Sequence, residues 1–133
     1  MMRQLLRYGF LALAIAAAAP AEAQNYRVIG AWRCIAATPA APIVFDLVFN
    51  ADGYYSGAYS GPNDFRAYSE GPYRLTGTLL GITYGVWETT PTPTPNPGGE
   101  TYSVQFRGGE AMTLIPTRCP PGSECRFACE RHR

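Results

Sequence analysis

The feature that most constrains this fold is a two-residue alternation of apolar and polar side chains between clusters of Gly, Pro, Asn and Asp. Residues 43–50 show it most clearly, because they place Ile43, Phe45, Leu47 and Phe49 on one face of an extended chain. No segment after residue 23 has a sustained apolar period of 3.6 residues. This pattern is typical of short antiparallel strands with one buried face, so we predict an all-β protein.

The turns between the predicted strands contain residues that favour tight reversals. Asn50 to Gly53 is predicted as a hairpin turn, because Asp52 can bond to its own backbone and Gly53 readily takes positive φ. An antiparallel meander can protect its edges by closing its first strand against its last. We therefore expect a small, disulfide-bonded barrel or half-barrel of about seven to eight strands. The predicted strands cover residues 29–36, 43–50, 54–59, 68–75, 78–87, 101–106 and 111–115.

Within the strand predicted over residues 78–87, unbroken alternation puts Tyr84 and Val86 on one face and Trp87 on the other. A Pro-rich loop is predicted at residues 89–99, with Pro at every second position from 91 to 97. Proline has no backbone donor and a fixed φ, which favours a stiff, extended connection over a central strand. A peptide ligand for another protein's groove is the less favoured interpretation.

The N-terminus has the three parts of a secretion signal. Arg3 and Arg7 precede an apolar run at residues 10–19, and Ala21 and Ala23 flank Glu22 as a small-x-small cleavage tripeptide. We predict a signal peptide at 1–23 and a single domain at 24–133, periplasmic or secreted. The apolar run is about half of the roughly 20 residues that span a bilayer, so we expect no stable membrane anchor.

All four Cys residues follow the predicted cleavage site, and an even number in an oxidising compartment predicts two disulfides. Cys125 and Cys129 are close in sequence, which favours Cys34 joined to one C-terminal Cys and a local bridge between the other two. Which partner Cys34 takes, among Cys119, Cys125 and Cys129, stays open. Such a bridge would pin the Cys-rich tail at 117–133 onto the first strand. A zinc site that adds His132 is less favoured.

Several short motifs, in their order and spacing, resemble a small bacterial lipocalin-like domain. The likeness extends over most of residues 28–116. It implies a calyx-shaped barrel or half-barrel, with Trp32 closing its bottom. The motifs are Gly30-Ala31-Trp32, Phe49-Asn50-Ala51-Asp52-Gly53-Tyr54-Tyr55, Gly71-Pro72-Tyr73-Arg74-Leu75-Thr76-Gly77 and Gly109-Glu110-Ala111-Met112-Thr113-Leu114.

No catalytic apparatus is apparent, so we expect no enzyme activity, no cofactor and no metal. The single His is His132, next to the chain end, where side chains are seldom held in place. Residues 24–133 hold nine Arg, no Lys and nine acidic residues, a balance that disfavours nucleic acid as a partner. The acids considered for an acid-base pair are Asp46, Asp52, Asp64, Glu70 and Glu88.

The stretch from Tyr54 to Tyr68 combines Tyr with Ser, Gly and Asn, a composition found in recognition surfaces. We therefore predict a non-catalytic binding protein that holds a small apolar ligand or presents this Tyr-rich stretch to an envelope protein. An inhibitor of an envelope hydrolase such as lysozyme is the alternative, on size and architecture. Oligomeric state is left open. The predicted binding residues are Trp32, Tyr54, Tyr55, Tyr59, Tyr68 and Trp87.

Overall fold

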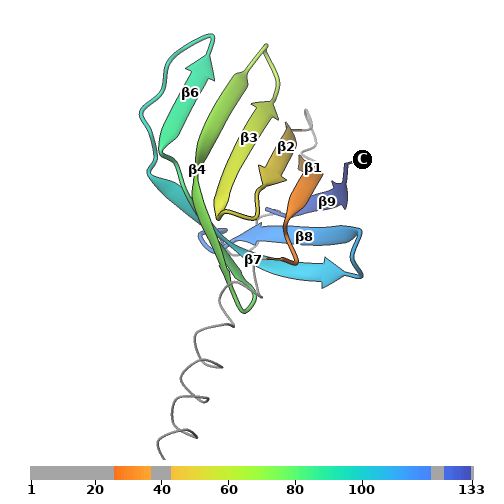
Figure 1. The fold of residues 1–133 in the computed structure, drawn as a ribbon. Helices are drawn as coiled ribbons and strands as arrows, with labels where there is room; N and C mark the ends of the chain where they lie inside the picture. Colours follow the sequence, from red (N-terminus) through yellow and green to blue (C-terminus); the bar gives the residue numbers. More distant parts are fainter. Residues whose placement is uncertain (1–25, 37–42, 121–124, 133) are drawn as a thin grey trace, which may run out of the picture.

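The computed structural model describes residues 26–36, 43–120 and 125–132, which form nine β-strands (Figure 1). The predicted signal peptide and part of the predicted tail lie outside these residues. Within the described ranges, no helix is long and apolar enough to cross a membrane. The strands are β1 (Gly30–Ala36), β2 (Ile43–Phe49), β3 (Tyr54–Ser60), β4 (Arg66–Thr76), β5 (Leu79–Thr83), β6 (Val86–Thr90), β7 (Gly99–Arg107), β8 (Ala111–Pro116) and β9 (Phe127–Arg131).

Eight of these strands form a closed antiparallel barrel. The sheet runs from β3 through β2, β1, β9, β8, β7 and β5 to β4, and the pairing of β3 with β4 closes it. Strand β6 stands outside the barrel and pairs with the first half of β4 (Figure 1). The predicted all-β, disulfide-bonded barrel is confirmed.

The alternation in residues 43–50 appears as predicted. Phe45, Leu47 and Phe49 are buried, whereas Asp46 faces outward and forms an ion pair with Arg33, with 2.8 Å between its Oδ1 and the arginine Nε. The following turn also has the expected chemistry. The Asp52 carboxylate accepts a hydrogen bond from the Tyr54 amide, and Gly53 has a φ of 84°.

Buried side chains from all eight barrel strands meet in one cluster that occupies the interior. An eight-stranded barrel has an interior just wide enough to be filled by side chains or to hold one small ligand. Here large apolar and aromatic side chains take that space. The largest fully buried ones include Trp32, Tyr55, Phe49, Leu75, Leu80, Met112 and Leu114.

The single strand predicted over residues 78–87 is wrong, because the chain is bulged between β5 and β6. Glu70 lies opposite Val86 and Tyr73 opposite Ile82, so residues 83–85 face only residues 71–72 of β4. One extra residue reverses the alternation beyond it. Tyr84 and Trp87 consequently pack against each other, with 4.9 Å between ring centroids, instead of lying on opposite faces.

The predicted closure of residues 29–36 directly against 111–115 is also wrong. Strand β9, from the C-terminal tail, lies between β1 and β8 and pairs with both. Cys34 is opposite Cys129 in this pairing, and the two form a disulfide. Cys119 and Cys125 form the second bridge, so the predicted long-range and local pair is confirmed. Two disulfides are typical of proteins in an oxidising, extracellular environment.

The Pro tract at residues 91–97 forms no strand, as predicted, and it is exposed and folds back onto β6. The Thr89 hydroxyl accepts a hydrogen bond from the Thr94 amide and donates one to the Thr92 carbonyl. The Trp87 indole N–H donates to the Thr94 hydroxyl. Through these bonds the Pro tract lies against β6, and its alternate Pro residues have no backbone N–H to donate. Pairing of a strand from another chain with β6 is therefore disfavoured.

Candidate functional site

The aromatic residues singled out in the sequence occupy three separate places. Trp32 is 1% exposed, and its indole N–H donates to the Val28 carbonyl over 2.8 Å. The Arg131 guanidinium lies 4.4 Å from the centre of a Trp32 ring and donates to the carbonyls of Ile29 and Arg27. These contacts join the N-terminal segment to β9, which makes Trp32 a structural residue.

Tyr55 and Tyr59 belong to the barrel interior, whereas Trp87 is half-buried on β6, outside the barrel, beside Tyr59 and Tyr84. The Tyr55 hydroxyl donates to the Ser69 hydroxyl over 2.9 Å, and the Tyr59 hydroxyl lies 3.3 Å from the same atom. Burial raises the pKa of Tyr55, an effect that the bond to Ser69 partly offsets. The Tyr59 ring packs edge-on against Phe45, with centroids 4.6 Å apart. These aromatic side chains occupy the place where a calyx would hold a ligand.

Sequence reasoning missed an inward-facing carboxylate, that of Glu100 on β7. Its Oε2 lies 3.3 Å from an Arg118 nitrogen, while its Oε1 is buried without a hydrogen-bond partner among the described residues. Burial raises the pKa of Tyr102, and the negative charge of Glu100 contributes to the rise. The alternation of residues 100, 102 and 104 along β7 is the sequence signal that would have placed Glu100 inside.

Tyr54 and Tyr68 lie on the outer face of the sheet, 43% and 39% exposed. The Tyr68 hydroxyl donates to Glu70 over 2.7 Å, and Glu88 is its cross-strand neighbour on β6. The hydrogen bond to Glu70 raises the pKa of Tyr68, and burial and the charges of Glu70 and Glu88 raise it further. We call Tyr54, Tyr68, Glu70 and Glu88 the acidic tyrosine patch.

A hollow of about 220 Å³ adjoins Tyr68. Its lining includes Ala58 and Glu88, which flank Tyr68 across the strands, together with Arg66. The Arg66 guanidinium donates to the Phe65 carbonyl. Neither Glu70 nor Glu88 has a cationic partner among the described residues. The patch therefore presents two unneutralised carboxylates beside an exposed aromatic ring.

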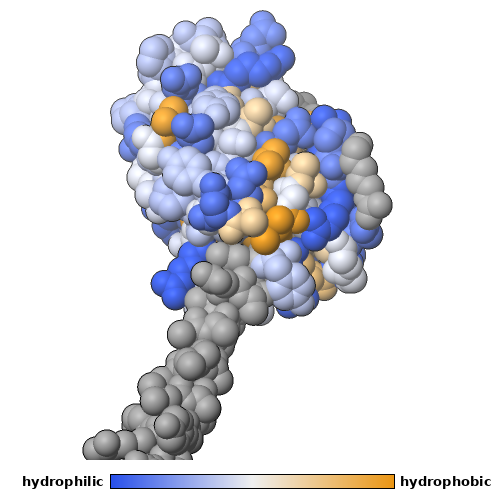
Figure 2. Space-filling model, in the orientation of Figure 1, coloured by the Kyte–Doolittle hydropathy of each residue, from blue (hydrophilic) through white to orange (hydrophobic). Residues whose placement is uncertain are grey.

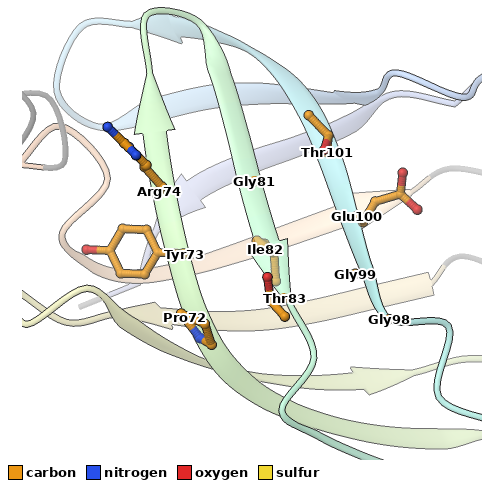
Figure 3. Close-up of a pocket in the computed structure, with 10 residues that line it drawn as sticks. All are labelled: Pro72, Tyr73, Arg74, Gly81, Ile82, Thr83, Gly98, Gly99, Glu100 and Thr101. Carbon is orange, nitrogen blue, oxygen red and sulfur yellow. The ribbon is translucent and has the colours of Figure 1, made fainter.

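A larger hollow, of about 530 Å³, lies across β4, β5 and β7 (Figure 3). Gly81 lies at its centre, between its cross-strand neighbours Arg74 and Thr101. Figure 3 shows Arg74 on the β4 side and Thr101 on the β7 side, while the Glu100 side chain points away from β5. We call this hollow the Gly81 groove. It joins residues distant in the sequence, and no sequence motif pointed to it.

Of the acids considered for catalysis, Asp46, Glu70 and Glu88 lie on different strands, and Asp52 and Asp64 lie in turns. Asp46 is paired with Arg33, and Asp52 holds its turn, whereas Glu70 and Glu88 belong to the acidic tyrosine patch. Among the described residues, no group of three or more His, Cys, Asp or Glu side chains is placed to hold a metal ion. Both disulfides use Cys side chains of the alternative zinc set, which leaves no thiolate there for a metal.

The face of the molecule in Figure 2 is mostly hydrophilic or intermediate, with a few small hydrophobic areas. This face therefore shows no extensive apolar surface of the kind that marks a hydrophobic docking site. No model of a known protein family matches this chain, and a search among curated proteins also finds no match.

Proposed function

We propose that this chain is an exported, non-catalytic, lipocalin-like binding protein that recognises its partner on the outside of the barrel. The partner we propose is a protein that presents a basic segment to the acidic tyrosine patch. The observation that carries the proposal is the pair of unneutralised carboxylates, Glu70 and Glu88, beside the exposed ring of Tyr68.

The chemistry of the patch favours Arg or Lys side chains. A cation over an exposed aromatic ring gains about 0.5–1 kcal/mol. Each exposed carboxylate that it also reaches adds a few tenths of a kcal/mol to about 1 kcal/mol. Tyr54 and Tyr68 provide contact area at low entropic cost, since each side chain has few rotatable bonds.

The packed interior supports an outer site over a calyx. A ligand inside the barrel would have to displace side chains such as Tyr55, Phe45 and Leu47, which are buried in the central cluster. The Tyr55 hydroxyl would also lose its bond to Ser69. Displacing packed core side chains costs several kcal/mol. The apolar-ligand version of the function is therefore less favoured than partner binding on the surface.

The test is a fluorescence-anisotropy titration of the protein with a labelled Arg-Gly-Arg-Gly-Arg peptide. We expect saturable binding that weakens as salt is added, because exposed charges are screened. Replacing Glu70 and Glu88 together with Gln should weaken binding about tenfold, which corresponds to about 1.4 kcal/mol. Tyr68→Leu should weaken it by several fold, because it keeps an apolar side chain but removes the aromatic face.

The matched control is Asp64→Asn with Glu130→Gln, which removes the same charge from exposed positions outside the patch. This variant should bind the peptide nearly as the unaltered protein does. Equal weakening in the two double variants would show that only net charge matters, and the proposal would then be wrong. Absence of saturable binding to the unaltered protein would also refute it.

A further inference from the structure

Gly81 occupies a position where the fold itself does not require glycine. It lies inside β5 in regular pairing, opposite Arg74 on β4 and Thr101 on β7, and it has no positive φ. A Cβ built on Gly81 would meet only the Arg74 carbonyl oxygen, at an ordinary contact distance of 3.9 Å. Glycine inside a strand is destabilising, and it often marks a place where a ligand approaches the backbone closely.

Two neighbouring glycines show the contrast. A Cβ at Gly71 would lie 1.9 Å from the Thr83 carbonyl oxygen, and one at Gly99 would lie 2.4 Å from the Ile82 carbonyl oxygen. Both positions need glycine because a side chain would collide with backbone. At Gly81 no such collision requires glycine. Gly81 does, however, form the floor of the hollow of about 530 Å³.

The side chains around Gly81 are polar, and their charge favours an anion. Thr83 and Thr101 offer exposed hydroxyls, and the Arg74 guanidinium has no hydrogen-bond or ion-pair partner among the described residues. Glu100 is the acid in this lining, but its side chain points away from β5 (Figure 3) and its Oε2 is paired with Arg118. An Arg side chain binds a carboxylate through charge-assisted hydrogen bonds, while Thr hydroxyls suit the hydroxyl groups of a ligand.

We propose that the Gly81 groove binds a small hydroxylated anion of the sugar-acid type. Its carboxylate contacts Arg74, and its ring lies over the bare backbone at Gly81 with its hydroxyls toward Thr83 and Thr101. This site is on β4, β5 and β7. It is separate from the acidic tyrosine patch and has the opposite charge preference, so the two proposals stand independently.

The experiment is an amide NMR titration of the purified protein with D-glucuronate, with glucose and inorganic phosphate as separate probes. Glucuronate should shift the amide signals of Gly81, Thr83 and Thr101 in a saturable way. Glucose lacks the anion and phosphate lacks the ring, so each should bind about tenfold more weakly or not at all. The proposal would be overturned if phosphate bound as tightly as glucuronate, or if glucuronate caused no saturable shift of these amide signals.

Two variants locate the site. Gly81→Val fills the groove from its floor and should abolish the glucuronate shifts, whereas Gln105→Val places the same Val side chain at an exposed position of β7 and should leave them unchanged. Arg74→Gln should weaken glucuronate binding about tenfold, while Arg107→Gln should not. The dispersed amide spectrum of each variant verifies folding. Unchanged glucuronate binding by a folded Gly81→Val protein would overturn the assignment.

Discussion

Replacing Cys34 and Cys129 together with Ser should lower the free energy of unfolding by about 4 to 5 kcal/mol in the chain-entropy model. The two residues are 95 apart in sequence, so their bridge closes a loop that includes most of the described chain. Removing it enlarges the conformational freedom of the unfolded state far more than that of the native barrel. Urea denaturation followed by circular dichroism measures the loss.

The second disulfide provides the matched control. Cys119 and Cys125 are six residues apart, and replacing both with Ser should cost only about 2 kcal/mol, because a short loop gains less entropy. Both double variants are free of unpaired thiols, so disulfide exchange does not obscure the comparison. Equal losses in the two variants would contradict the proposed role of the long-range bridge.

Trp32→Ala should be the most damaging single substitution outside the cysteines, with a loss of about 4 kcal/mol. The substitution leaves a cavity in the buried cluster and removes the indole donor to the Val28 carbonyl. It also takes away the ring beneath the Arg131 guanidinium. Since small domains are stable by about 5–15 kcal/mol, this variant should be close to unfolding at ambient temperature.

Trp87→Ala is the corresponding control, because the protein has two Trp residues. Trp87 is half-buried beside Tyr84 and Tyr59, so its loss should cost about 1 to 2 kcal/mol. Thermal and urea unfolding of both variants, followed by far-ultraviolet circular dichroism, provide the comparison. If the Trp87→Ala protein were less stable than the Trp32→Ala protein, the contacts of Trp87 with Tyr59 and Tyr84 would matter more for stability than the burial of Trp32, contrary to this prediction.

Much of the barrel is predictable from local patterns, because strands with one buried face carry strict alternation. Residues 43–50 and the turn at Asn50 to Gly53 are examples. The bulge after Thr83 was missed because it depends on the opposite strand. Residues 83–85 face only Gly71 and Pro72 of β4, and within 78–87 the local sign of this bulge is Gly85, since glycine inside a strand often marks one.

Strand β9 was missed for a different reason. Its sequence, Phe127–Arg131, has little apolar alternation, and its place in the barrel comes from backbone pairing with β1 and β8. The Cys34–Cys129 bridge and the Arg131 contacts add to that pairing. Cysteine spacing correctly predicted that the tail would be tied to the first strand, but it carried no information on strand pairing.

The candidate sites were only partly predictable. The stretch from Tyr54 to Tyr68 was recognised as Tyr-rich, but alternation sends Tyr55 and Tyr59 inward and leaves Tyr54 and Tyr68 outside. Glu88 joins Tyr68 only through the pairing of β6 with β4. The Gly81 groove likewise depends on the register of three strands, which no local pattern in the sequence determines.

Because the barrel interior is filled by its own side chains, we expect any binding to take place outside it. Native mass spectrometry of the purified protein with excess palmitate tests it directly, since this long-chain acid suits an open apolar calyx. We expect the protein to appear at its own mass, without retained palmitate, under conditions where the Arg-Gly-Arg-Gly-Arg peptide is retained. A one-to-one palmitate complex, lost on substitution of interior residues such as Leu47 or Val104, would show instead that the barrel has an open interior.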